Sequence, residues 1–73
     1  MKLEERFNLR SAQLVEVQKP SVRTGGGLAL GIKVTFIAAA EHDFRSIGLH
    51  LTPTEALQLA EDLIHCAHHQ LTR

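Results

Sequence analysis

A chain of 73 residues, with 44% hydrophobic and 22% charged residues, has the composition of a small folded domain rather than of a disordered segment. Its formal net charge is zero and it has no Tyr or Trp, which argues against a nucleic-acid-binding protein, because phosphates are bound by Lys and Arg and bases stack on aromatic rings. Domains this small usually need a disulfide, a metal or a partner for stability, and a single cysteine excludes an internal disulfide.

The first predicted element is a strand over about residues 8–19. Val15 and Val17 alternate there with polar residues, as expected for a strand with one buried face. Leu3 and Phe7 are four residues apart, so a helical turn is an alternative for the N-terminal segment. We therefore expect one strand before the glycine run of the chain.

The glycine run at residues 25–27 predicts a flexible loop into a second strand over residues 28–39. The apolar positions that alternate in this strand are Leu28, Leu30, Ile32, Val34, Phe36 and Ala38. A third strand over residues 43–51 alternates in the same way. Only a short turn, at residues 40–43, separates the second and third strands, so we expect them to pair antiparallel.

The strongest pattern predicts a helix over residues 53–71. Thr52 is a good N-cap residue, Pro53 suits the first helical position, and Glu55 completes a capping box with Thr52. Apolar residues then recur at steps of three and four along one stripe of the helix. The members of this stripe are Leu57, Ala60, Ile64, Ala67 and Leu71.

These elements predict an α+β fold, a three-stranded antiparallel β-meander with one C-terminal α-helix packed on one face (β-β-β-α). We expect a single small domain over residues 1–73. Leu59, Leu63 and Cys66 widen the apolar part of the helix beyond the stripe of about 100° that covers a sheet. This flank is either buried by a partner or tolerated at the surface, where single apolar residues are common.

The predicted outward face of the sheet also favours a partner. It carries few charges, and the glycines at 31 and 48 indicate either close approach of another chain or a local bulge or bend. We therefore expect a homodimer, since a second copy would bury these surfaces. The predicted interaction surface consists of Leu59, Leu63, Cys66, Gly31, Lys33, Thr35, Ile37, Gly48 and His50.

A histidine and cysteine cluster lies near the end of the predicted helix. His65 and His69 are one turn apart and can bind one metal ion, and Cys66 offers a further ligand. The interpretation that the sequence favours is that these side chains interact with the carbonyl groups at the helix C-terminus. The alternative is a zinc or nickel site at His65, Cys66 and His69, with His68 nearby and further ligands from a second copy.

No pattern in the sequence indicates catalytic residues. Cys66 and the adjacent histidine point in different directions on a helix, and the TGGG run lacks the Lys-Ser/Thr of a phosphate-binding loop. Segment 47–67 resembles strand–helix units of short bacterial and phage proteins, and this resemblance implies no particular activity. We expect a non-enzymatic interaction module, a regulator, inhibitor or adaptor, that binds itself and another protein.

Two other functions remain open from the sequence. One is a metal-binding or metal-responsive protein that uses the histidine and cysteine cluster. The other is a weak nucleic-acid-binding protein that uses basic residues expected on the sheet side, namely Arg10, Lys19, Arg23, Lys33 and Arg45. The small number of aromatic residues weighs against the second.

The expected location is the cytoplasm. No stretch has the roughly 18 consecutive apolar residues of a membrane helix, and the first ten residues, MKLEERFNLR, carry acids and no apolar run, unlike a signal peptide. A lone thiol also favours a reducing compartment.

Overall fold

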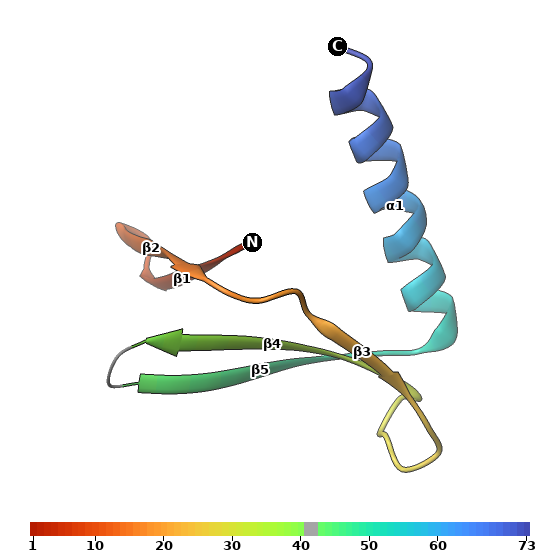
Figure 1. Cartoon of the computed structure of the whole chain (residues 1–73). Coiled ribbons are helices and arrows are strands. Elements are labelled where there is room, and N and C mark those ends of the chain that lie inside the picture. The colour runs from red at the N-terminus through yellow and green to blue at the C-terminus, as the bar shows by residue number, and fades with distance from the viewer. Residues whose placement is uncertain (41–42) are drawn as a thin grey trace. The chain divides into compact units, whose positions relative to one another are not determined.

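The computed structural model describes residues 1–40 and 43–73 and has an α+β fold, with five strands in two antiparallel sheets followed by one helix (Figure 1). The elements are β1 (Lys2–Asn8), β2 (Ser11–Glu16), β3 (Ser21–Thr24), β4 (Ile32–Ala40), β5 (Asp43–Leu51) and α1 (Pro53–Leu71). One sheet pairs β1 with β2, and the other has the order β3-β4-β5. The predicted α+β class and the C-terminal helix are confirmed, and the prediction of three strands is corrected to five.

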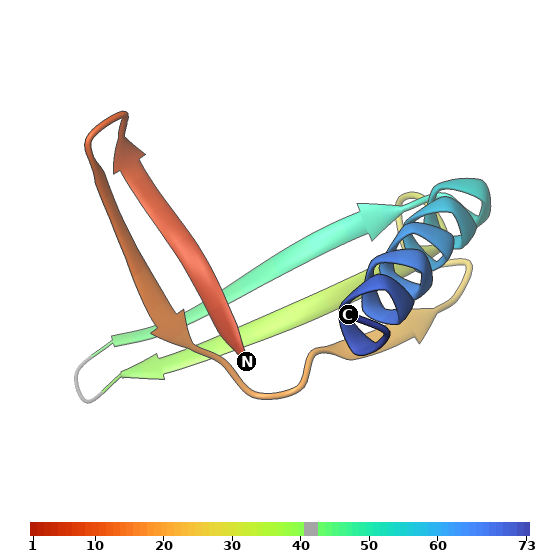
Figure 2. The ribbon, with the colours of Figure 1, turned by 90° about the horizontal axis from the view of Figure 1, so that it is seen from above.

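The chain divides into two compact units. The first consists of residues 1–22 and 34–49, and the second of residues 23–33 and 50–73. Figure 2 shows β1 and β2 as one hairpin and β4 and β5 as a longer pair of strands. The predicted turn between β4 and β5 falls on residues 41 and 42, which lie outside the described residues.

The single strand predicted over residues 8–19 is wrong, because the chain reverses direction at its start. The side-chain Oδ1 of Asn8 accepts a hydrogen bond from the backbone N–H of Arg10 at 2.8 Å, which is an Asx-turn. This turn joins β1 to β2 in an antiparallel register that pairs Leu3 with Val15 and has an irregularity between Arg6 and Asn8. The helical turn considered for the N-terminal segment is therefore also wrong, because those residues form β1.

The first unit has a very small core. Val17 and Ala38 are the buried hydrophobic residues in the described part of the chain, and no large side chain there is fully buried. The backbone N–H of Val17 donates to the carbonyl of Met1 at 2.9 Å, which continues the pairing between β1 and the segment after β2.

An ion pair joins the β1–β2 hairpin to β5. The guanidinium Nη1 of Arg45 lies 2.7 Å from Oε1 of Glu5. The side chain of Glu5 is only 10% exposed, and that of Arg45 is 40% exposed. The side-chain amide of Gln13 on β2 also donates to Oε2 of Glu5, at 3.3 Å. A carboxylate this poorly solvated depends on its partners, because burying an unpaired charge is costly.

The glycine-rich loop is longer than predicted. The second strand was expected to begin at residue 28, but β4 begins at Ile32, and residues 25–31 form a loop closed by a hydrogen bond from Gly25 N–H to the Gly31 carbonyl at 3.2 Å. Gly31 has a φ of 98°, a conformation that costs other residues energy. A Cβ atom at Gly31 would meet no atom of this chain within 4 Å, so within the chain the backbone conformation is the reason for a glycine here.

The short strand β3 was not predicted, because the expected strands end at residue 19 and resume at residue 28. Its sequence, SVRT, has one apolar residue, and all four residues are exposed. β3 is an edge strand of the β3-β4-β5 sheet and pairs with β4 through backbone hydrogen bonds. Its side chains do not show the alternation from which a strand could have been predicted.

The predicted helix and its start are confirmed. The backbone N–H of Glu55 donates to Oγ1 of Thr52 at 3.2 Å, and the backbone N–H of Thr52 donates to Oε1 of Glu55 at 3.0 Å. These hydrogen bonds with the Thr52 backbone and hydroxyl lower the pKa of the Glu55 carboxyl, because they favour its charged form. At the other end, Thr72 donates its backbone N–H to the His68 carbonyl at 3.0 Å.

The capping box gives a prediction for the stability of α1. We expect Thr52→Ala to lower the unfolding free energy by about 1 kcal/mol, whereas Thr54→Ala, in the same first turn, should have little effect. Because the folded-state pKa of Glu55 is lowered, its contribution is complete above the ordinary carboxyl pKa, about 4.3, and is lost as the pH falls through the folded value. Urea unfolding followed by circular dichroism from pH 7 to pH 3 measures both effects, and Glu55→Gln should remove this part of the pH dependence.

Candidate functional site

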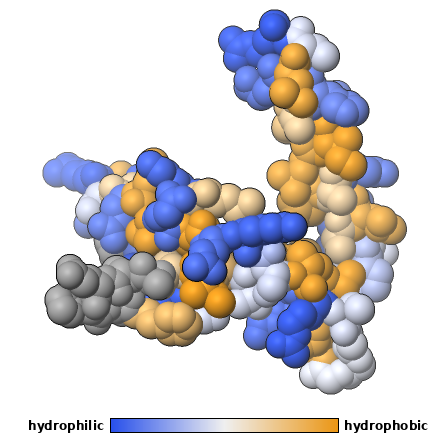
Figure 3. Space-filling model, in the orientation of Figure 1, coloured by the Kyte–Doolittle hydropathy of each residue, from blue (hydrophilic) through white to orange (hydrophobic). Residues whose placement is uncertain are grey.

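The apolar stripe of α1 is exposed in the single chain. The side chains of Leu57, Ile64 and Leu71 are 69%, 57% and 82% exposed, and no residue of the helix is buried. Figure 3 shows hydrophobic residues along much of the length of α1 on the face turned to the viewer. The packing of this stripe on a sheet face stays a prediction from the sequence. We call Leu57, Ala60, Ile64, Ala67 and Leu71 the helix stripe.

The flank of the helix stripe is exposed as well. Leu59, Leu63 and Cys66, which the sequence places in the interaction surface, are all exposed. They follow the helix stripe at the same three- and four-residue spacing, so the two rows form one continuous apolar surface. The helical part of the predicted interaction surface is therefore accessible.

The strand residues of the predicted interaction surface do not all lie in strands. Lys33, Thr35 and Ile37 alternate along β4, with Lys33 and Thr35 half-buried and Ile37 exposed. Gly48 and His50 alternate along β5, and both are exposed. Gly31 lies in the loop before β4, so the prediction that it lies on a sheet face is wrong.

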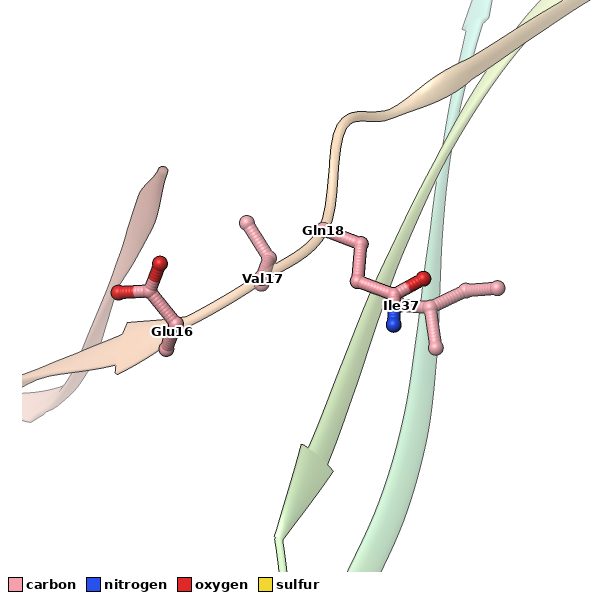
Figure 4. A pocket seen from close by; sticks show the side chains of 4 residues that line it. All are labelled: Glu16, Val17, Gln18 and Ile37. Atoms are coloured by element: carbon pink, nitrogen blue, oxygen red, sulfur yellow. The ribbon is translucent and has the colours of Figure 1, made fainter.

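One hollow in the first unit was not predicted. It has a volume of about 330 Å³ and is lined by Glu16, Val17, Gln18 and Ile37. Figure 4 shows Glu16 at the end of β2 and Val17 and Gln18 directly after it, whereas Ile37 belongs to β4. The polar side chains of the hollow are the Glu16 carboxylate, which forms an ion pair with the N-terminal amino group at 3.1 Å, and the Gln18 amide. The sequence contains no pattern that predicts this hollow, because the hollow forms only where the segment after β2 passes Ile37 of β4.

The histidine and cysteine cluster shares a hollow on the surface of α1. This hollow has a volume of about 310 Å³ and is lined by His65, Cys66, His69 and Gln70. Cys66 is exposed and unpaired by any disulfide. Over residues 1–40 and 43–73, no three His, Cys, Asp or Glu side chains are arranged to hold one metal ion. The three predicted ligands are thus brought to one hollow, and a closed metal site needs ligands from elsewhere.

Comparison of the chain with protein-family models, with curated proteins and with solved structures finds no match. No helix within the described residues combines the length and the hydropathy needed to cross a bilayer. The site must therefore be interpreted from its own residues, and its main feature is the exposed apolar surface of α1.

Proposed function

We propose that this protein is a small non-enzymatic interaction module that acts as a homodimer. The observation that carries the proposal is the row of large apolar side chains that are exposed on α1, at Leu57, Leu63, Ile64 and Leu71. A second copy that covers this row removes it from water, and burial of apolar surface is the main favourable contribution to association.

The composition of the accessible surface supports the same proposal. The described residues include two buried hydrophobic residues, while large apolar residues on β2, β3, β4, β5 and α1 are exposed. A core of this size cannot offset the conformational entropy of a 73-residue chain, because burial of apolar surface is the main favourable contribution to folding. A second copy supplies the missing contacts and makes stability depend on protein concentration.

Strand addition is the binding mode that we propose for the partner protein. β5 is an end strand of its sheet and is nine residues long. Exposed apolar side chains at Phe44, Ile47 and Leu49 lie along it. An end strand with these properties accepts an extended segment of another chain through backbone hydrogen bonds, and its side chains give specificity. A regulator, inhibitor or adaptor that binds an extended segment is the corresponding role.

The mass in solution tests the proposal. In sedimentation equilibrium at micromolar concentration we expect twice 8.1 kDa, and the thermal midpoint should rise with protein concentration. The competing arrangement folds the helix stripe onto the sheet of its own chain, and it predicts a monomer whose thermal midpoint is independent of concentration. A monomer with such a midpoint would overturn the proposal.

A second candidate function, metal binding, is favoured by the hollow that His65, Cys66 and His69 share. Two such sites from two copies would supply enough ligands for zinc or nickel. The same sedimentation experiment with added zinc and with EDTA distinguishes the two functions. A dimer mass that is unchanged by both reagents supports the apolar interface, and a dimer that appears only with zinc supports the metal site.

A further inference from the structure

We propose that two copies associate through antiparallel pairing of their α1 helices along the helix stripe. This inference rests on the proposed homodimer and names the surface that forms it. The occupant of the exposed helix face is thus a second copy of the same face. Three features of α1 carry the inference: the spacing of the stripe, the sizes of its residues and the polar side chains that flank it.

The spacing of the helix stripe is that of a two-helix seam. Its positions advance by three and four residues in turn, which is the a and d pattern of a heptad repeat. The stripe runs from Leu57 to Leu71, a rise of about 21 Å at 1.5 Å per residue. A second helix can follow it over that whole length, because the chain leaves the large residues of the stripe exposed.

The sizes of the residues select the antiparallel direction. The large residues Leu57, Ile64 and Leu71 all occupy a positions, and the alanines 60 and 67 both occupy d positions. Parallel helices pair a with a and d with d, so layers of two large residues would alternate with layers of two alanines. Antiparallel helices pair a with d, so every layer joins one large and one small residue and packs evenly at short distance.

The polar side chains that flank the stripe favour the same direction. Glu61 and His68 lie about 80° and about 60° from the centre of the stripe, on the same flank, whereas the other acidic and basic side chains of α1 lie about 120° or more from it. An antiparallel pair brings this flank of one helix beside the same flank of the other, so that Glu61 lies near His68 of the second copy, whereas a parallel pair brings it beside the flank of Leu63 and Gln70. Antiparallel helix dipoles also attract each other.

The seam leaves the histidine and cysteine hollow free. At 100° per residue, the midpoint between His65 and His69 lies about 140° around the helix from the centre of the stripe. A dimer that forms along the stripe therefore does not bring these side chains together. Dimerisation that requires zinc would place the interface on the opposite side of α1 and overturn the inference.

Disulfide trapping tests the direction of the pairing. In a Cys66→Ala background, the chain with Ile64→Cys is mixed with the chain carrying Ala60→Cys or Ala67→Cys and oxidised mildly. Antiparallel a–d layers place Ile64 opposite one of these two alanines, so we expect one mixture to cross-link about tenfold or more faster than Leu71→Cys alone. In a parallel pair Leu71 faces itself, and its cysteine variant would link first.

The outcomes separate this inference from the proposed function. Rapid self-linking of Leu71→Cys overturns the antiparallel direction. A dimer mass with no linking in either mixture overturns the helix interface and leaves the homodimer standing, with the β5 edge as the next surface to probe. A monomer mass for the unmodified chain overturns the proposed function and this inference together.

Discussion

Replacing Ile64 with aspartate is expected to convert the dimer into a monomer. Ile64 is at the middle of the helix stripe and is 57% exposed, so the second copy that we propose would bury it. A carboxylate there would lose its hydration against apolar side chains of the second copy without gaining a partner. A cost of about 3 kcal/mol weakens the dimer by more than about a hundredfold.

The matched control for this substitution is Gln58→Asp. Gln58 is also exposed on α1, but it lies about 140° around the helix from the centre of the stripe. Both variants introduce one negative charge into the same helix, and only Ile64→Asp should change the mass measured by sedimentation. Because the core of the single chain does not offset its conformational entropy, we expect the Ile64→Asp monomer to lose most of its circular dichroism signal and Gln58→Asp to retain it. Equal loss of the dimer in both variants would contradict the helix interface.

The helix was predictable from sequence because its determinants are local. Thr52, Pro53 and Glu55 lie within four positions, and their hydrogen bonds are those that the capping-box pattern requires. The same locality explains why His65 and His69 lie beside one hollow, because residues four apart on a helix share a face. The cap of a helix and the residues that share one of its faces can therefore be predicted from residue spacing alone.

The strands before the glycine loop were less predictable. The Asn8 side chain accepts a hydrogen bond from the backbone N–H of Arg10 where the chain reverses direction. The turn residues Leu9 and Arg10 do not include the glycine that usually marks a hairpin. Period-two alternation continues across the residues of β2, so the pattern shows a strand without showing where it begins. An Asn placed between two alternating segments is the signal that sequence reasoning passed over.

Contacts between distant segments could not be predicted at all. The hollow at Glu16, Val17 and Gln18 needs Ile37 from β4, and the ion pair of Glu5 needs Arg45 from β5. Nothing in the spacing of these residues relates them, because their proximity follows from how the hairpin and the longer strands come together. The sequence did indicate an excess of apolar surface, since that property depends on composition and periodicity rather than on particular contacts.

The excess of apolar surface and the small core have the same physical origin. Two of the strands, β1 and β3, carry mainly polar and charged residues, so they contribute hydrogen bonds to the sheets and little apolar burial. The apolar side chains are concentrated in β4, β5 and α1. This division is the physical basis of the homodimer that we propose, in which a second copy completes the apolar packing.

Breaking the Glu5–Arg45 ion pair is expected to destabilise the first unit by about 1–3 kcal/mol. The Glu5 carboxylate is 10% exposed, so water cannot replace the guanidinium that lies 2.7 Å away, and Arg45→Met leaves a desolvated charge. Partial exposure of Arg45 places the expected value below that of a fully buried pair. The measurement is a double-mutant cycle with Glu5→Gln, Arg45→Met and both together, which isolates this pair from other interactions of Arg45.

The control cycle uses the ion pair between Glu4 and Arg6 in the same hairpin. Its charged atoms are 3.4 Å apart and both side chains are more than half exposed, so its coupling should be about 0–0.5 kcal/mol. Urea unfolding at one fixed protein concentration gives both couplings, since stability of a dimer varies with concentration. Because Glu5 and Arg45 join β1 to β5, a large coupling for this pair alone means that the hairpin is held on the longer strands by one poorly solvated charge. Equal small couplings in the two cycles would mean that the hairpin is held by Val17 and Ala38 instead.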